Sequence, residues 1–170
     1  FNQAALCDSM AVCLGGCAVA DLSAGRHIRQ WAFSPAAAAA LEQLVDASFQ
    51  VVFFAGEELL VTPASAVFFT RHYPGNLLHR FQTITEAPWQ YAADHGLAPC
   101  KLLVLGEADR LAWLRRAASE IADLHITSSD STNLELMPAG ADKGRALSLL
   151  CGQWGCPMEE PAALGVSEND

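Results

Sequence analysis

The chain has 170 residues, of which 52% are hydrophobic and 17% are charged, and its formal net charge at pH 7 is −9. This length is enough to bury a substantial core in one or two domains, and the composition is typical of a globular protein. An acidic protein repels phosphate backbones, so nucleic-acid binding is not expected as a main role. No apolar stretch is long enough to span a bilayer, so no membrane partner is expected.

The cysteines favour a reduced, cytoplasmic protein. None of them forms a Cys-x-x-Cys pair, and they stand among apolar residues, as small buried hydrophobic side chains do. The six are Cys7, Cys13, Cys17, Cys100, Cys151 and Cys156. The first residues lack the basic flank of a signal peptide. Because the chain begins on Phe1 and ends within a motif, we interpret both ends as cut.

Strands and helices are predicted to alternate along the chain. In chain order we expect strands at 11–20 and 26–33, a helix at 34–47, strands at 49–55 and 58–62, a helix at 87–95, a strand at 101–105, a helix at 107–121, strands at 124–128 and 133–137, a helix from 142, and a strand at 161–165. Residues 63–82 contain Pro74-Gly75 and are expected to include a loop. This alternation indicates an α/β fold.

Two helices carry clear local signals. Ser34-Pro35 is typical of a helix start, because Ser is a good N-cap and Pro is tolerated at the first helical position. The helix after Gly106 has leucine, alanine and isoleucine residues at helical spacing, which predicts one buried face. Asp142 is expected to cap the last helix, and Lys143 follows it directly. A cation in the first turn of a helix opposes the helix dipole, so Lys143 is best tolerated beside an anion.

The tail of the sequence resembles the end of a Cof-type phosphatase of the haloacid dehalogenase (HAD) superfamily. The match is carried by residues 133–138, by the Lys143-Gly144 pair and by the loop Gly165-Val166-Ser167-Glu168-Asn169-Asp170. Residues 12–18 are similar to the family's Asn-Gly-Ala loop, with Gly15 in the place of Asn and Cys17 in the place of Ala. The resemblance implies a magnesium-dependent phosphatase of sugar phosphates or similar small phosphomonoesters.

The resemblance also implies an arrangement of domains. Residues 1–30 would hold a partial core strand and the entry to the cap, residues 31–131 an α/β cap domain, and residues 132–170 the C-terminal part of the core. The expected fold is therefore an α/β cap inserted in a partial HAD-like (Rossmann-like) core.

The family pattern assigns roles to residues near the C-terminus. Lys143 corresponds to the lysine that stabilises the phosphoryl group and its nucleophile, and Gly144 keeps side-chain bulk away from that site. Asn169 and Asp170 correspond to the end of the Mg²⁺-binding motif, whose first aspartate is replaced here by Val166. An isopropyl group cannot coordinate Mg²⁺, so Mg²⁺ binding is expected to be weak or absent.

The family's nucleophile motif, Asp-x-Asp, does not occur in these residues. That aspartate attacks phosphorus, and its partner acts as general acid and base. We therefore expect a HAD-superfamily fragment without phosphatase turnover. Two alternatives remain: a non-catalytic module that binds phosphorylated ligands, and an interaction module that self-associates as a homo-oligomer.

A small phosphorylated metabolite is the expected ligand. One interpretation of Arg71 and His72, next to Tyr73, is a cap loop that reaches the phosphate or the sugar. The other interpretation of these residues is an exposed loop with ordinary aromatic side chains. The sequence leaves both interpretations open.

Overall fold

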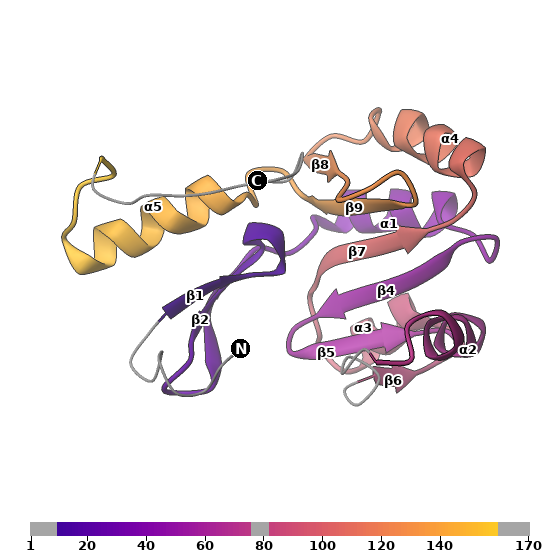
Figure 1. Ribbon diagram of the computed structural model, residues 1–170, viewed down its shortest axis with the longest axis horizontal. Coiled ribbons are helices and arrows are strands. Elements are labelled where there is room, and N and C mark those ends of the chain that lie inside the picture. The colour runs from indigo at the N-terminus through magenta and orange to yellow at the C-terminus, as the bar shows by residue number, and fades with distance from the viewer. Residues whose placement is uncertain (1–9, 76–81, 160–170) are drawn as a thin grey trace.

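The computed structural model describes residues 10–75 and 82–159, which form two β-sheets and the helices around them (Figure 1). The predicted strand at 161–165 and the predicted metal-loop residues Val166, Asn169 and Asp170 lie outside the described residues. None of the helices in these two ranges has the length and apolar character that a membrane crossing requires.

The larger sheet has six strands in the order β6-β5-β4-β7-β9-β8. Its strands are β4 (Gln50–Ala55), β5 (Glu58–Val61), β6 (Gln82–Ile84), β7 (Pro99–Leu105), β8 (Leu124–Thr127) and β9 (Asn133–Pro138). All neighbours pair antiparallel except β5 and β6, which are parallel. The tight turn at Gly56, where φ is +64°, joins β4 to β5 as the sequence predicts.

Helices cover one face of this sheet. They are α1 (Pro35–Leu44), α3 (Pro88–Asp94) and α4 (Ala108–Ala118). The core between them contains alternate residues of the strands, such as Leu102 and Leu136, packed against Leu41 and Leu114 of the helices. In Figure 1 the helices α1 and α4 lie along the same side of the strands. Residues 31–131, predicted as an α/β cap, thus combine a sheet with helices.

The opposite face of the sheet is covered at two places. Helix α2 (Pro63–His72) packs Ala66 and Phe69 against β4 and β5. Elsewhere on this face, Cys17 and the partly buried Leu14 and Trp31 pack into the same cluster as Met137. Helix α2 therefore covers one part of this face, and the segment that contains Leu14, Cys17 and Trp31 covers another part.

The smaller sheet joins the N-terminal strands to the last helix. Its strands are β1 (Met10–Cys13), β2 (Ala18–Asp21) and β3 (Arg26–Gln30), paired antiparallel in that order. A 3-10 turn, η1 (Leu14–Gly16), connects β1 to β2. Helix α5 (Lys143–Trp154) packs Ala146 and Leu150 against Val19 of β2. Figure 1 shows α5 and this sheet together, beside the larger sheet.

One predicted helix end needs correction, and the structure assigns one segment that the sequence leaves open. Helix α1 ends at Leu44 rather than near Ala47, because the Asp46 carboxylate accepts hydrogen bonds from the backbone and hydroxyl of Ser48 and forms a turn. The unassigned segment 63–82 begins with a ten-residue helix, α2. Strand β9, just after residue 131, pairs with both β7 and β8 of the larger sheet.

Candidate functional site

The turn Leu14–Gly16 occupies a conformation that favours glycine. The φ angles of Leu14, Gly15 and Gly16 are +55°, +72° and +103°. Left-handed backbone costs a residue with a Cβ about 1–2 kcal/mol, so two glycines here allow a turn that other residues resist. The single strand expected over residues 11–20 is therefore two strands, β1 and β2, with a sharp change of direction at Gly15-Gly16.

Gly16 touches the beginning of helix α5. A Cβ atom on Gly16 would lie 2.6 Å from the backbone nitrogen of Lys143 and would overlap the carbonyl carbon of Asp142. The missing side chain allows the turn and the helix start to meet backbone to backbone. Such a junction presents peptide groups from two separate segments, and the N-terminus of a helix favours anions.

Helix α5 begins as the sequence predicts. The Asp142 carboxylate accepts a hydrogen bond of 2.7 Å from the backbone N–H of Arg145, which is the expected N-cap arrangement. Lys143 is the first helical residue and is half-buried, while Gly144 is exposed. A Cβ on Gly144 would approach the Asp142 carboxylate oxygen to 3.2 Å. The structure therefore brings Lys143 and Gly144 to the Leu14–Gly16 turn.

A buried ion pair lies next to the same turn. The ammonium of Lys101 donates a hydrogen bond of 2.7 Å to Oε2 of Glu135, and the two residues are 8% and 7% exposed. A Cβ on Gly15 would lie 3.5 Å from Lys101 Nζ and 3.6 Å from Glu135 Oε2. One short turn thus contacts the start of α5 through Gly16 and the ion pair through Gly15.

A pocket of about 220 Å³ opens on this face of the sheet. Leu103, Leu105, Asn133 and Glu135 line it from the strands, and Phe69 and Tyr73 line it from the region of α2. Asn133 is held by Ser129, whose backbone N–H donates to the amide oxygen at 3.1 Å. Glu135 therefore belongs both to the ion pair beside the turn and to the wall of the pocket.

The loop between β8 and β9 adds a second carboxylate to this pocket. Asp130 accepts hydrogen bonds of 2.6 Å from the hydroxyl and from the backbone N–H of Thr132. These hydrogen bonds lower the pKa of Asp130 below its ordinary value, so the side chain is ionised at neutral pH. The pocket is consequently acidic and accepts hydrogen bonds more readily than it donates them.

Burial makes the two cysteines near the turn unreactive. Cys17 and Cys100 are fully buried, and desolvation raises the pKa of Cys17 to about 12 and that of Cys100 to about 11. The Cys100 thiol also donates to the carbonyl of Phe54 at 3.3 Å. Thiols of this kind are weak nucleophiles, because only the thiolate attacks. Their position agrees with the prediction that these cysteines serve packing.

Arg71 and His72 lie in a helix and not in a cap loop. Both lie in the last turn of α2 and are exposed. The His72 ring stacks on Phe68 with centroids 4.3 Å apart, and its Nδ1 lies 2.9 Å from the Phe68 carbonyl oxygen. They do not line the pocket beside Glu135, and Figure 1 shows α2 and α5 at opposite ends of the view.

The described residues supply no obvious magnesium site. Within residues 10–75 and 82–159, no three histidine, cysteine, aspartate or glutamate side chains gather closely enough to hold a metal ion. Mg²⁺ prefers an octahedral shell of oxygen ligands, which an isolated carboxylate does not provide. Asn169 and Asp170 lie outside the described residues.

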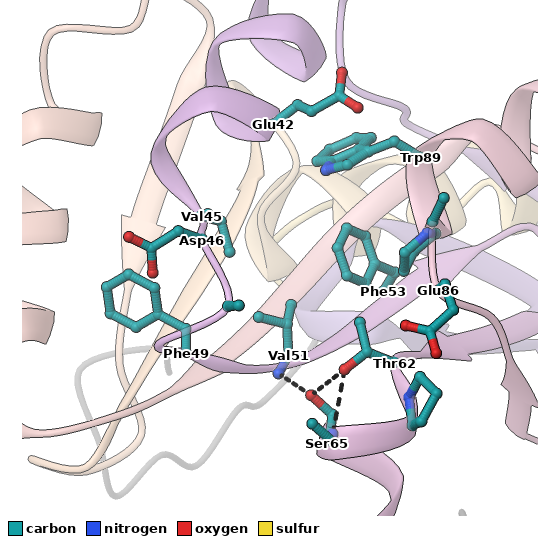
Figure 2. Close-up of a pocket in the computed structure, with 15 residues that line it drawn as sticks. Glu42, Val45, Asp46, Phe49, Val51, Phe53, Thr62, Ser65, Glu86 and Trp89 are labelled. Carbon is teal, nitrogen blue, oxygen red and sulfur yellow. Dashed lines mark hydrogen bonds between the residues drawn. The ribbon is translucent and has the colours of Figure 1, made fainter.

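A larger cavity lies on the helix-covered side of the sheet. It measures about 420 Å³ and is lined by Phe53 and Trp89 and by the carboxylates Glu42, Asp46 and Glu86. Figure 2 shows these side chains around the opening, together with the Ser65 hydroxyl that accepts from the backbone of Val51 at 3.0 Å. Three carboxylates and no cation among its lining residues make this cavity a poor phosphate site.

Sequence reasoning missed the Lys101–Glu135 pair and the pocket beside it. The signal was available, because Lys101 and Glu135 each interrupt an otherwise apolar strand with a charge. Two opposite charges in two buried strands indicate a paired contact, since lone buried charges are costly. Which strands become neighbours depends on the sheet order, and the sequence alone does not provide it.

Comparison with known proteins assigns the family. The sequence profile of the haloacid dehalogenase-like hydrolases matches residues 1–170. The chain therefore belongs to the haloacid dehalogenase-like hydrolase family, and the predicted superfamily is confirmed.

Two characterised relatives are similar over part of the chain. The mannosylfructose-phosphate phosphatase of Agrobacterium fabrum is 32% identical over 97 residues, covering 56% of this chain and 38% of the relative. Phosphatase YwpJ of Bacillus subtilis is 45% identical over 58 residues, covering 34% of this chain and 20% of the relative. The matches thus span well under half the length of either relative.

Solved structures share the fold. A haloacid dehalogenase-like hydrolase from B. subtilis superposes with a TM-score of 0.76 at 21% identity, covering 96% of this chain and 65% of that one. The HAD subclass IIB sugar phosphatase BT4131 superposes with a TM-score of 0.71 at 13% identity, covering 95% and 58% of the two chains. The predicted α/β, HAD-like fold is confirmed by these likenesses.

Proposed function

We propose that this protein binds small phosphorylated metabolites such as sugar phosphates, with the phosphoryl group held between the Leu14–Gly16 turn and the start of α5. The observation that carries the proposal is the backbone contact between Gly16 and the Asp142–Lys143 peptide. It brings the half-buried Lys143 and a helix N-terminus to one turn, and both favour an anion. The names of two similar proteins, a mannosylfructose-phosphate phosphatase and a sugar phosphatase, agree with this ligand class.

The reaction of the family would be phosphomonoester hydrolysis. In that reaction Lys143 would compensate the negative charge of the phosphoryl group, and Gly144 would leave room for it. Mg²⁺ would supply further charge neutralisation, and Asn169 and Asp170 are the residues proposed to lie near it. Val166 removes one expected ligand, so we propose weak or absent metal binding.

We propose that the 170 residues bind the phosphorylated ligand without turning it over. No Asp-x-Asp occurs in the sequence, so the attacking aspartate and its acid–base partner are not supplied by these residues. The division into a cap, residues 31–131, and core parts on either side stays a proposal, as does a cytoplasmic location.

The test measures turnover and binding with the same samples. Phosphate release from an aryl phosphate with Mg²⁺ should be equal for the wild type and for Lys143→Ala. Calorimetry should show binding of a hexose 6-phosphate to the wild type, weakened about tenfold or more in Lys143→Ala. Mg²⁺-dependent release by the wild type above that variant would refute the absence of turnover. Equal binding by both proteins would refute the phosphate site.

A self-associating interaction module is the second candidate. Strand β1 pairs only with β2 among the described residues, so its outer edge is open to another chain. Trp154 of α5, in the same unit, is 56% exposed. If this unit mediates self-association, sedimentation should show concentration-dependent dimers that Trp154→Ser weakens. Trp113→Ser, on the exposed side of α4, is the matched control and should leave the dimer unchanged.

A further inference from the structure

We propose that Glu135 is a specificity-determining residue, which accepts hydrogen bonds from the hydroxyl groups of an uncharged sugar and disfavours ligands that carry a second negative charge beside it. The inference rests on the proposed function, because it takes the phosphoryl group to lie at the Leu14–Gly16 turn. It goes further by assigning the remainder of the ligand to the pocket of about 220 Å³ on the sheet.

The register of the sheet places Glu135 between the turn and the pocket. Val52, Leu103, Glu135 and Thr127 are successive partners across four strands and share one face. Leu105 and Asn133 are the next partners across β7 and β9 whose side chains lie on this same face. Lys101 lies two residues before Leu103, so it shares the face on the side of the turn. A ligand with its phosphoryl group at the turn would therefore meet Glu135 first.

The polar groups around Glu135 are suited to hydroxyl donors. Oε2 of Glu135 is occupied by Lys101, and no described residue donates a hydrogen bond to Oε1. The Thr127 hydroxyl, directly across the sheet, is also buried without a hydrogen-bond partner among the described residues. A carboxylate oxygen accepts hydrogen bonds and does not donate them while ionised. A sugar hydroxyl is a donor of the required kind.

The charges of the pocket oppose a second anion. Glu135 and Asp130 both line it, and none of its lining residues is a lysine, arginine or histidine. A carboxylate or a second phosphate on the ligand would therefore face Glu135, whose charge is balanced by Lys101 alone, and Asp130, with no cation among the lining residues. The apolar part of the wall, Leu103 and Leu105 with Phe69 and Tyr73, is suited to the C–H faces of a sugar ring.

Lys101 acts as a positioning residue for Glu135. Its ammonium holds Oε2 at 2.7 Å, and Gly15 closes the other side of the pair without a side chain. The pair fixes the carboxylate in one orientation, with its second oxygen left for a ligand. Loss of Lys101 should therefore alter ligand preference as well as folding.

The test compares two ligands of similar size. One is a hexose 6-phosphate, whose only charged group is the phosphate, and the other is 6-phosphogluconate, which adds a carboxylate. Calorimetry on the whole chain should show that the wild type prefers the hexose phosphate. Glu135→Gln keeps the shape of the side chain and removes its charge. It should bind the hexose phosphate about tenfold less tightly and bind 6-phosphogluconate equally well or better. Glu120→Gln, exposed after α4, is the matched control and should preserve the wild-type preference.

Further variants separate folding, phosphate binding and specificity. Lys101→Met with Glu135→Leu replaces the pair by apolar residues that are expected to pack, and it should fold and lose the preference. If Lys143→Ala abolishes binding but Glu135→Gln changes the affinity for neither ligand, the inference fails and the phosphate site stands. If Lys143→Ala has no effect, the proposed function fails. If the wild type binds neither ligand, both proposals are overturned.

Discussion

The two sheets of this protein are stabilised in different ways. The six-stranded sheet packs against α1, α3 and α4 over a continuous core that includes the fully buried Leu41, Leu102, Leu114 and Leu136. The buried apolar cluster of the small sheet and α5 consists of Val19, Ala146 and Leu150. Burial of apolar surface is the main source of stability, so the larger sheet is expected to fold with little help from the smaller one.

The smaller unit depends on its contacts with the larger one. Cys17, Leu14 and Trp31 pack into the apolar cluster on the face of the large sheet opposite to α1, α3 and α4. The Phe33 N–H also donates to the Pro99 carbonyl at 2.9 Å, which joins the connection after β3 to the start of β7. The candidate site thus lies where the smaller sheet, with its small apolar core, meets the larger and more stable sheet. Changes at this junction should affect both stability and binding.

Lys101→Met should produce the largest effect. It leaves the Glu135 carboxylate buried without its partner, which typically costs about 3–5 kcal/mol of stability. Urea unfolding followed by circular dichroism measures this loss. The double variant Lys101→Met with Glu135→Leu should recover most of it. A single variant as stable as the wild type would show that the pair contributes nothing to the junction.

Gly16→Ala should be the next most damaging change. The added methyl overlaps the Asp142–Lys143 peptide, and φ at this position is +103°. Overpacking and left-handed backbone together should cost about 2–4 kcal/mol and displace the start of α5. Gly25→Ala is the matched control, because φ is +62° and nothing lies within 4 Å of its Cβ. Equal stability losses in the two variants, by thermal unfolding, would argue against a tight contact at Gly16.

The smallest effect expected is on thiol reactivity. The pKa of Cys17 is raised to about 12 and that of Cys100 to about 11, so at pH 8 less than about one thiol in a hundred of either kind is ionised. Alkylation followed by peptide mass spectrometry should label the partly exposed Cys156 before Cys17 and Cys100. Cys17 and Cys100 should react only after unfolding. Early labelling of Cys17 in the native protein would show that the junction opens readily.

The sequence was a good guide to local structure. The hairpin turn at Gly56, the cap at Ser34 and the start of α5 at Asp142 each follow from residues adjacent in the chain. In the segment 63–82, the aromatic residues and Pro74-Gly75 obscure the capping signal at Thr62-Pro63. The Thr62 hydroxyl in fact accepts from the backbone of Ser65 at the start of α2.

Long-range arrangement was less predictable. The approach of Gly16 to Lys143 joins residues that are far apart in the chain, and no local pattern in the sequence predicts it. The Lys101–Glu135 pair required the knowledge that β7 and β9 are neighbours. Sheet order depends on the packing of the whole domain, so it does not follow from local periodicity.

The most direct test of the central claim is a two-dimensional ¹H–¹⁵N NMR titration of the whole chain with inorganic phosphate. The account predicts saturable shifts of the backbone amides of Gly15, Gly16, Lys143 and Gly144, which are lost in Lys143→Ala. Shifts centred on the cavity around Trp89, or no saturable shifts at the turn and the start of α5, would contradict it.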